Sequence, residues 1–284
     1  MSNGVKKMAA HAQPPQFLAR IVRAKRAELE SAKLRVPQKE LEKRVTARPP
    51  GRFLQALVPA PEGQRSCAII AELKKASPSA GVLRENYDPS GIARRYREAG
   101  ARALSVLTDR EFFQGSLDDL KQAKAASTLP ALRKDFTLEE YHLYEAAAAG
   151  ADAVLLIVAI LQPQVLRRLL SMSGTLGLDA LVEVHTAEEL VVALEAGSEI
   201  IGVNNRNLHT FEVSTETSFA LIGDIPDETV AVSESGLRSA EDLERLRSAG
   251  FDAFLIGESF MRNEDPGEAL QRLLADVAAR APMI

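Results

Sequence analysis

Eight short apolar runs follow one another from Cys67 to near the end of the chain, separated by longer stretches with helical spacing. Each run and the stretch after it take roughly 27 residues, the length of one strand and one helix. The runs are almost continuously apolar, which is typical of parallel strands covered on both faces. They span residues 67–73, 103–107, 131–133, 153–158, 180–184, 200–203, 230–232 and 253–256.

Eight successive strand–helix units predict an α/β fold, a (β/α)8 barrel. The alternative is an open doubly wound sheet, but no G-x-G-x-x-G motif follows the first run, which disfavours its dinucleotide-binding form. Helical stretches end in Ala-Gly at Gly100, Gly150 and Gly250, shortly before an apolar run. A glycine that accepts positive φ can end each helix there.

The chain before the first apolar run is organised differently. Residues 1–16 are expected to be a flexible lead-in, residues 17–66 a helical extension and residues 67–284 the barrel. Leu18 and Ile21 belong to an amphipathic helical pattern that continues to residue 34.

Prolines bracket a second short helical stretch after that helix. We interpret the whole extension as a small capping element, with a solvated linker as the alternative. The pattern leaves open whether the first helix covers the functional site or packs beneath the barrel.

Composition limits the function classes. The chain is 46% hydrophobic and 26% charged, which suits a globular protein, and its net charge of −4 gives no reason to expect a nucleic-acid or membrane partner. The longest apolar run, residues 153–161, is about half of a membrane span. Lys6 and Lys7 precede no apolar segment, so no secretory signal is predicted. We expect a cytoplasmic monomer acting on a small molecule.

Cysteine and histidine usage argues against a metal site. The single cysteine, Cys67, excludes an intramolecular disulfide and a cysteine-based zinc cluster. His11, His142, His185 and His209 lack the spacing of metal ligands. We interpret His185, close to Glu183, as a residue in a loop or at a helix start.

Polar residues gather where the predicted strands end, and chemistry in such barrels occurs at that end. They are Glu72, Lys74, Lys134, Glu183 and Asn204. The period of two along a strand places Glu72 and Lys74 on the side that faces the barrel axis. Five polar groups at one mouth are costly to desolvate unless they are paired or used. Lys–Glu pairing shifts the two pKa values in opposed directions and supplies acid and base candidates.

The last two strands carry a second signal. Ser235-Gly236 and Gly257-Glu258 each place a glycine just past a strand, before a helical stretch. Backbone N–H groups in such positions can hold a phosphate, and two ordinary turn glycines are the alternative.

Two loops add to this mouth. Residues 76–81 are rich in turn formers and long enough to act as a lid. Phe112 and Phe113 offer an apolar wall for a flat ring, although Phe112 is equally suited to packing.

The motifs at all eight strand ends resemble, in order, those of the indole-3-glycerol phosphate synthase family. The resemblance extends from about residue 17 to residue 279 and includes the extra N-terminal helices. The matching segments are IAELKKASPS (70–79), SVLTD (105–109), FQGS (113–116), LRKDF (132–136), AVLLI (153–157), VEVH (182–185), IGVNNRNL (201–208), SESG (233–236) and FLIGESFM (254–261).

The resemblance implies a reaction that needs no cofactor or metal. In 1-(2-carboxyphenylamino)-1-deoxyribulose 5-phosphate, the ring carbon that bears the carboxylate attacks the C2 carbonyl. Carbon dioxide and water then leave, and an indole forms. Lys134 resembles the general acid, and Glu183 the proton-transfer partner in dehydration. Lys74 would hold the substrate carboxylate or join the later proton transfer, with Glu72 orienting it. A cationic mouth that lowers the pKa of the lysine acid would help.

The resemblance also assigns binding roles. Asn204 would anchor the substrate, Arg206 would support its carboxylate region, and Ser235 and Glu234 would position the sugar hydroxyls and the lysines. The phosphate would be held by Ser77, Gly236, Gly257 and Glu258. The chain departs from the family pattern at Ala80, where a basic residue is common, and at Phe260, where leucine is common.

Two rival functions fit this sequence less well. An isomerase of the same pathway would need a Cys or Asp acid–base pair at the strand ends, whereas Cys67 lies at the start of the first strand. A barrel that only binds a phosphorylated ligand should have lost Lys74, Lys134 or Glu183, and all three are present.

Overall fold

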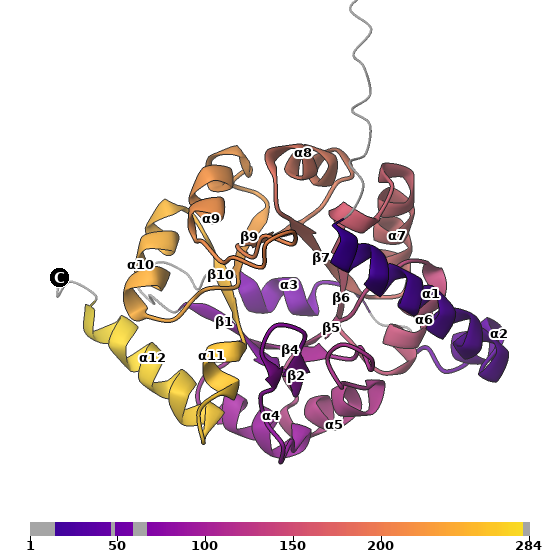
Figure 1. The fold of residues 1–284 in the computed structure, drawn as a ribbon, viewed down its shortest axis with the longest axis horizontal. Coiled ribbons are helices and arrows are strands. Elements are labelled where there is room, and N and C mark those ends of the chain that lie inside the picture. The colour runs from indigo at the N-terminus through magenta and orange to yellow at the C-terminus, as the bar shows by residue number, and fades with distance from the viewer. Residues whose placement is uncertain (1–14, 47–48, 59–66, 281–284) are drawn as a thin grey trace, which may run out of the picture.

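The barrel closes with eight parallel strands in the order β1-β10-β9-β8-β7-β6-β5-β4 (Figure 1). The computed structural model describes residues 15–46, 49–58 and 67–280. Every predicted strand is present within two residues of its expected bounds, so the barrel is confirmed and the open sheet is excluded. The strands are β1 Ala68–Leu73, β4 Ala103–Leu107, β5 Ala131–Lys134, β6 Ala153–Ile157, β7 Asp179–Val184, β8 Ile200–Asn204, β9 Val230–Glu234 and β10 Ala253–Ile256.

Helices follow the strands and surround the barrel (Figure 1). A two-stranded hairpin of β2 Ala76–Ser77 and β3 Gly81–Val82 interrupts the connection after β1. The helices are α4 Pro89–Glu98, α5 Leu117–Ser127, α6 Glu140–Ala148, α7 Pro163–Thr175, α8 Ala187–Glu195, α9 Glu216–Leu221, α10 Ala240–Ala249, α11 Glu258–Met261 and α12 Pro266–Arg280, with short 3-10 turns at Val158–Ile160 and Ile222–Asp224.

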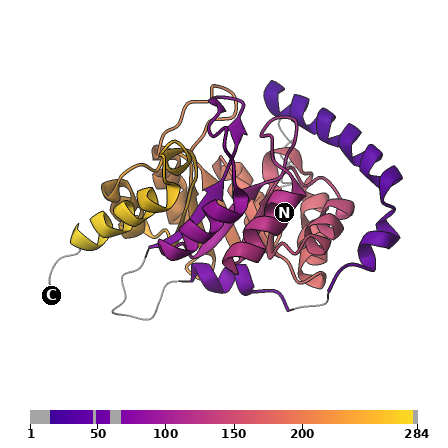
Figure 2. The same cartoon turned by 90° about the horizontal axis from the view of Figure 1, so that it is seen from below.

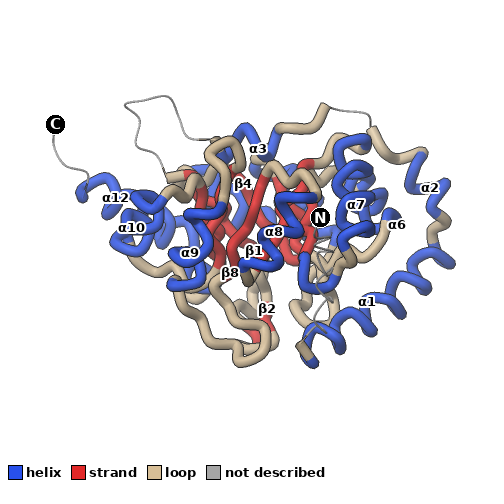
Figure 3. Tube along the Cα trace, turned by 90° about the horizontal axis from the view of Figure 1, so that it is seen from above, coloured by secondary structure: helices blue, strands red, loops and turns tan. Residues whose placement is uncertain are grey.

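The extension before the barrel contains α1 Gln16–Arg35, α2 Gln38–Glu42 and α3 Arg52–Leu57. The first helix begins at Gln16, within the predicted lead-in, whose residues 1–14 lie outside the described part of the chain. Figures 2 and 3 show α3 at one end of the barrel and α1 at the opposite end, on the side of the β2 segment. The first helix therefore lies on the side of the mouth.

The end of the barrel opposite the mouth is filled by α3. Phe53 and Leu57 are fully buried and pack against inward side chains such as Ile70, Leu132 and Leu181. Because the inward residues alternate along each strand, the next inward positions toward the mouth carry Glu72, Lys134 and Glu183 instead of apolar groups. The apolar interior thus ends where the polar mouth begins.

A single carboxylate holds α3 in this position. Asp179, at the start of β7, accepts hydrogen bonds from the backbone N–H groups of Gly51 at 2.7 Å, Phe53 at 2.8 Å and Leu54 at 3.0 Å. These are N–H groups at the beginning of a helix, which have no partner within the helix and favour a negative charge.

A buried ion cluster holds α1 against the barrel. Lys25 is 2% exposed, and its Nζ lies 2.8 Å from Asp109 Oδ2 and 2.9 Å from Asp135 Oδ1. Asp135 also binds Arg133 at 3.1 Å and accepts a hydrogen bond from Thr108 at 2.6 Å. Burial opposes the charge of Lys25, but the two aspartates outweigh it and raise its pKa above the usual range.

Asp179→Ala is expected to lower the free energy of unfolding by about 2 kcal/mol, because three N–H groups at the start of α3 lose their acceptor. Urea unfolding followed by circular dichroism measures this change. Asp227→Ala, at an exposed aspartate, is the matched control and should change stability by less than about 0.5 kcal/mol. Equal stability of the two variants would contradict the capping role.

Lys25→Met is expected to loosen α1 at a cost of about 3 kcal/mol, because buried Asp109 loses its cation and Asp135 keeps only Arg133. Hydrogen exchange should show lost protection in 16–35 while the β1 and β7 amides stay protected. Lys33→Met, which removes a half-exposed ion pair with Glu139, should leave that protection close to the original. Unchanged exchange of α1 in Lys25→Met would contradict this docking.

Candidate active site

A cavity of about 880 Å³ lies at the carboxyl ends of the strands. Its walls include thirteen of the residues that the sequence placed at the mouth, together with others from α1 and the loops. Those expected residues are Glu72, Lys74, Ser77, Phe113, Lys134, Glu183, Asn204, Arg206, Glu234, Ser235, Gly236, Gly257 and Glu258.

Lys134 is the centre of the charged part of this cavity. It ends β5 with its side chain inward, and its Nζ lies 3.0 Å from Glu183 Oε2 and contacts Glu234 Oε2. Burial opposes the ammonium charge, but Glu234, Glu183 and Glu72 outweigh it and raise the pKa of Lys134 above its usual range. The sequence predicted a lowered pKa in a cationic mouth. That prediction is wrong, because carboxylates surround this lysine.

The two carboxylates beside Lys134 differ in their acidity. Burial raises the pKa of each, and Lys134 opposes this. For Glu183, the charges of Lys134 and His185 outweigh the effect of burial and hold its pKa well below the usual range. For Glu234, burial and the neighbouring charges of Glu183 and Glu72 outweigh the effect of Lys134 and raise its pKa to about 7. The mouth therefore pairs an ionised carboxylate with one that takes up a proton near neutral pH.

A second ion pair lies beside the first. Lys74 Nζ is 2.7 Å from Glu72 Oε1, and both side chains are largely buried. Glycines give these carboxylates their room, since a Cβ at Gly257 would stand 2.3 Å from Glu72 Oε1, and one at Gly202 would stand 2.1 Å from Glu234 Oε1. Any larger residue at either position would displace a carboxylate.

The turn after β9 has an unusual backbone. Ser235 and Gly236 have φ angles of 67° and 81°, a region that disfavours side chains with a Cβ. The strain at Ser235 is typical of functional sites, and the turn directs successive backbone groups toward the cavity that both residues line.

Residues of α11 and of the hairpin also line the cavity. Glu258 binds Arg262 at 2.8 Å and lies 3.7 Å from Arg206. Ser77 Oγ accepts a hydrogen bond from the Ala80 N–H at 3.2 Å, inside the hairpin. Arg206 and Arg262 therefore both lie against Glu258 in the wall of the cavity.

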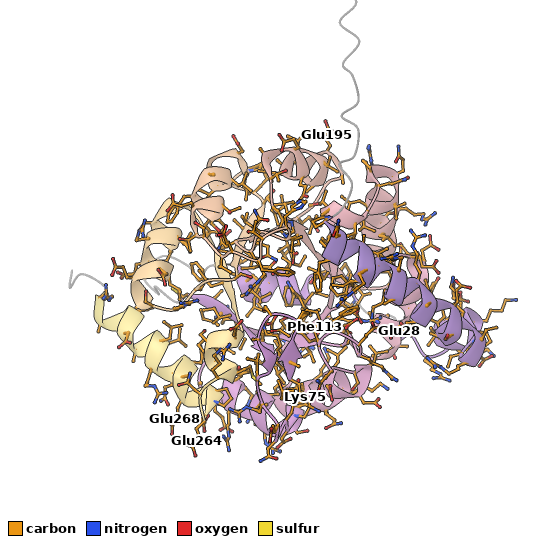
Figure 4. All side chains as sticks on the ribbon, viewed as in Figure 1. Glu28, Lys75, Phe113, Glu195, Glu264 and Glu268 are labelled. Atoms are coloured by element: carbon orange, nitrogen blue, oxygen red, sulfur yellow. The ribbon has the colours of Figure 1, made fainter. Side chains whose placement is uncertain are left out.

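The two adjacent phenylalanines have different surroundings. Phe113 lines the cavity near the centre of the view in Figure 4, with its ring 6.3 Å from that of Phe136. Phe112 instead packs against α1, 6.1 Å from the ring of Phe17 and 5.3 Å from the guanidinium of Arg20. Phe113 therefore forms the apolar wall of the cavity, and Phe112 packs against α1.

The sequence did not assign α1 to the cavity. Phe17, Leu18 and Ile21 line it, and the ring of Phe17 lies 5.0 Å from that of Phe211 in the loop after β8. The apolar spacing of Leu18 and Ile21 predicted a buried face, but it gave no signal of which part of the barrel covers that face. The ion cluster of Lys25 decides the position.

His185 also lies closer to the chemistry than expected. It follows β7 directly before α8, as interpreted from the sequence, but its ring Nε2 is 3.4 Å from Glu183 Oε1. The short spacing between Glu183 and His185 was visible in the sequence, although the fold alone brings both side chains together.

Within 15–46, 49–58 and 67–280, no group of three His, Cys, Asp or Glu side chains is placed to hold a metal ion. The same part of the chain has no helix that is both long and apolar enough to cross a membrane.

Solved structures with low sequence identity share this fold. A thiamine phosphate pyrophosphorylase from Pyrococcus furiosus aligns with a TM-score of 0.56 at 15% identity, covering 76% of this chain and 97% of its own. A mandelate oxidase variant aligns with a TM-score of 0.57 at 17% identity, covering 89% and 92%. At such identities the likeness establishes the barrel and nothing about the reaction.

Sequence comparison is more specific. The family model for indole-3-glycerol phosphate synthase matches residues 18–273. Proteins of that name from Polaromonas naphthalenivorans and Burkholderia ambifaria are 46% and 47% identical, over 92% and 90% of this chain and 99% and 98% of their own length. This chain belongs to the indole-3-glycerol phosphate synthase family.

Proposed function

We propose that the mouth of this barrel converts 1-(2-carboxyphenylamino)-1-deoxyribulose 5-phosphate into indole-3-glycerol phosphate. The observation that carries the proposal is the buried ammonium of Lys134 between Glu183 and Glu234, inside a cavity with an apolar wall and an anion-binding end. Ring closure requires an acid at a carbonyl oxygen, a base at a carbon, and a place for a phosphate. Each requirement has a group in this cavity.

Lys134 acts as the acid in ring closure. The ring carbon that bears the carboxylate attacks C2, and the carbonyl oxygen gains negative charge as the new bond forms. A fixed cationic donor in a largely dry site stabilises that charge most in the transition state. The raised pKa keeps Lys134 protonated until the oxygen becomes basic enough to take its proton.

Glu183 acts as the base in dehydration. After carbon dioxide has left, the hydroxyl departs as water and C1 loses a proton to complete the indole. An ionised carboxylate is needed at that point, and the pKa of Glu183 lies well below its usual range. Its contact with Lys134 at 3.0 Å lets the recovered proton return to the amine that Lys134 became when it gave up its proton.

Lys74 binds the substrate carboxylate, and Glu72, 2.7 Å away, orients Lys74 for this contact. Asn204 and Glu234 meet in register on β8 and β9, where they anchor the substrate and hold Lys134. Arg206 completes the carboxylate region. Phe113 packs against the anthranilate ring.

The phosphate binds at the turns after β9 and β10. The backbone there exposes N–H groups at the start of short helical turns, which suits an anion. It is held by Ser77, Gly236, Gly257 and Glu258, the last through its backbone, and Ser235 positions the sugar hydroxyls.

The substrate is a small phosphorylated molecule, and we place the enzyme in the cytoplasm as a monomer. The net charge of −4 favours no polyanionic partner. Among residues 15–46, 49–58 and 67–280, the exposed large apolar side chains Leu34, Val58, Val82 and Val191 lie on separate elements or loops and form no continuous apolar patch, which supports a monomer.

Lys134→Met is expected to reduce indole formation at least a thousandfold, because the carbonyl oxygen loses both its proton donor and its cation. The assay follows indole fluorescence from the purified protein and substrate, and a chain without tryptophan gives almost no background. Binding of a phosphorylated product analogue should change little. Turnover close to the original in this variant would contradict the acid role.

Glu183→Gln is expected to slow turnover by about a hundredfold, with a smaller change in KM, because the amide cannot accept the C1 proton. Glu145→Gln is the matched control, since Glu145 also binds a buried cation, Arg133 at 3.2 Å, but on the outside of the barrel. A loss below tenfold in Glu183→Gln, or an equal loss in both variants, would argue against the base role.

A further inference from the structure

His185 has a geometry that the reaction as described above does not use. Its side chain is 11% exposed, and Nε2 points to Glu183 Oε1 at 3.4 Å without the alignment of a hydrogen bond. That nitrogen is buried and makes no hydrogen bond within the part of the chain that the structure describes. A buried ring nitrogen that makes no hydrogen bond lowers the stability of the fold, so such a nitrogen is expected to have a function.

The other ring nitrogen leads outward. His185 Nδ1 lies 3.1 Å from Glu189 Oε2, and the same oxygen accepts the backbone N–H of His185 at 2.7 Å. Glu189 is in the first turn of α8, and its side chain is 21% exposed. Lys134, Glu183, His185 and Glu189 therefore form a row of contacts from the reacting end of the cavity to the solvent.

The proton balance of the reaction indicates a function for this row of contacts. The carbonyl oxygen of C2 takes up two protons before it leaves as water. C1 releases one proton when the indole double bond forms. The bond to the carboxylate breaks with its electron pair returning to the ring, so carbon dioxide leaves without a proton. Each turnover thus takes one proton from the solvent.

We propose that His185 and Glu189 deliver this proton to Glu183, and through Glu183 to Lys134. The proposal rests on the function proposed above. Lys134 gives up two protons in each turnover. Glu183 recovers one of them from C1, and the second reaches Glu183 through the imidazole. The Nε2 proton moves to Glu183 Oε1, and the ring regains a proton at Nδ1 from the side of Glu189.

The charges around the ring favour this role. Burial alone would lower the pKa of His185, but Glu183 and Glu189 outweigh it and raise the pKa to about 9. These two carboxylates are the ionisable groups that contact the ring from β7 and α8, and Lys134 on β5 reaches it only through Glu183. The imidazole therefore carries its proton at neutral pH and loses it as pH rises through about 9.

The first test is His185→Gln, whose amide nitrogen can replace Nε2 as a donor to Glu183 but cannot relay a proton. We expect kcat to fall about tenfold or more with KM changed less than about twofold. In the original protein, kcat should decline above about pH 9. This decline should be absent in His185→Gln.

A carboxylate pair on α8 provides a matched control. Glu189→Gln removes the outer partner of the ring and should lower kcat and shift the alkaline decline to lower pH. Glu188→Gln makes the same charge change on an exposed neighbour without contact to the ring, and both quantities should stay unchanged.

Chemical rescue separates relay from packing. His185→Ala leaves a space beside Glu183, and added imidazole should restore kcat in proportion to its concentration, with no effect on the original protein. Full activity of His185→Gln with an unaltered pH profile would overturn the proposal, as would a loss in His185→Ala that imidazole leaves uncorrected. If the original protein forms no indole at all, the proposed function fails before the relay is tested.

Discussion

The mouth of this barrel is organised by one buried ammonium group between two carboxylates. Lys134 occupies an inward position on β5, where water no longer compensates its charge, so Glu183 and Glu234 must do so. The approach of Glu234 requires space that only glycine leaves at Gly202. The chemistry proposed for the site follows from this arrangement, because the same contacts that make the charge tolerable place an acid and a base within 3.0 Å of each other.

The N-terminal extension is tied to both ends of the barrel by carboxylates of the strands and their loops. At the end opposite the mouth, Asp179 at the start of β7 binds the beginning of α3. On the side of the mouth, Asp135 just past β5 binds Lys25 of α1. Asp135 directly follows Lys134, so one strand end presents the acid to the inside and anchors the covering helix on the outside. The contact that holds α1 therefore lies one residue away from the lysine proposed as the acid.

The strands and the inward side chains could be predicted from the sequence because both depend on short-range periodicity. A short, almost continuously apolar run indicates the strand, and the period of two along a strand places Glu72 and Glu183 toward the axis. The position of α1 could not be predicted, since its amphipathic pattern requires a covered face and does not specify the cover. The ion pairs of Lys25 could not be predicted either, because its two partners lie more than 80 residues away in the chain.

The sign of the Lys134 pKa shift was mispredicted because it depends on which charges come closest in space. Inward Glu72, Glu183 and Glu234 outnumber inward Lys74 and Lys134, so this group of five side chains carries a net negative charge unless it takes up a proton. The raised pKa of Glu234, about 7, makes that carboxylate the place where the excess charge is relieved.

A substrate that carries a carboxylate and a phosphate increases the tendency to take up protons, and departure of carbon dioxide reverses it. The carboxylates of the mouth therefore favour protonation before decarboxylation and ionisation afterwards, when a base is needed at C1. The charge that the substrate itself brings and loses sets the order in which acid and base act.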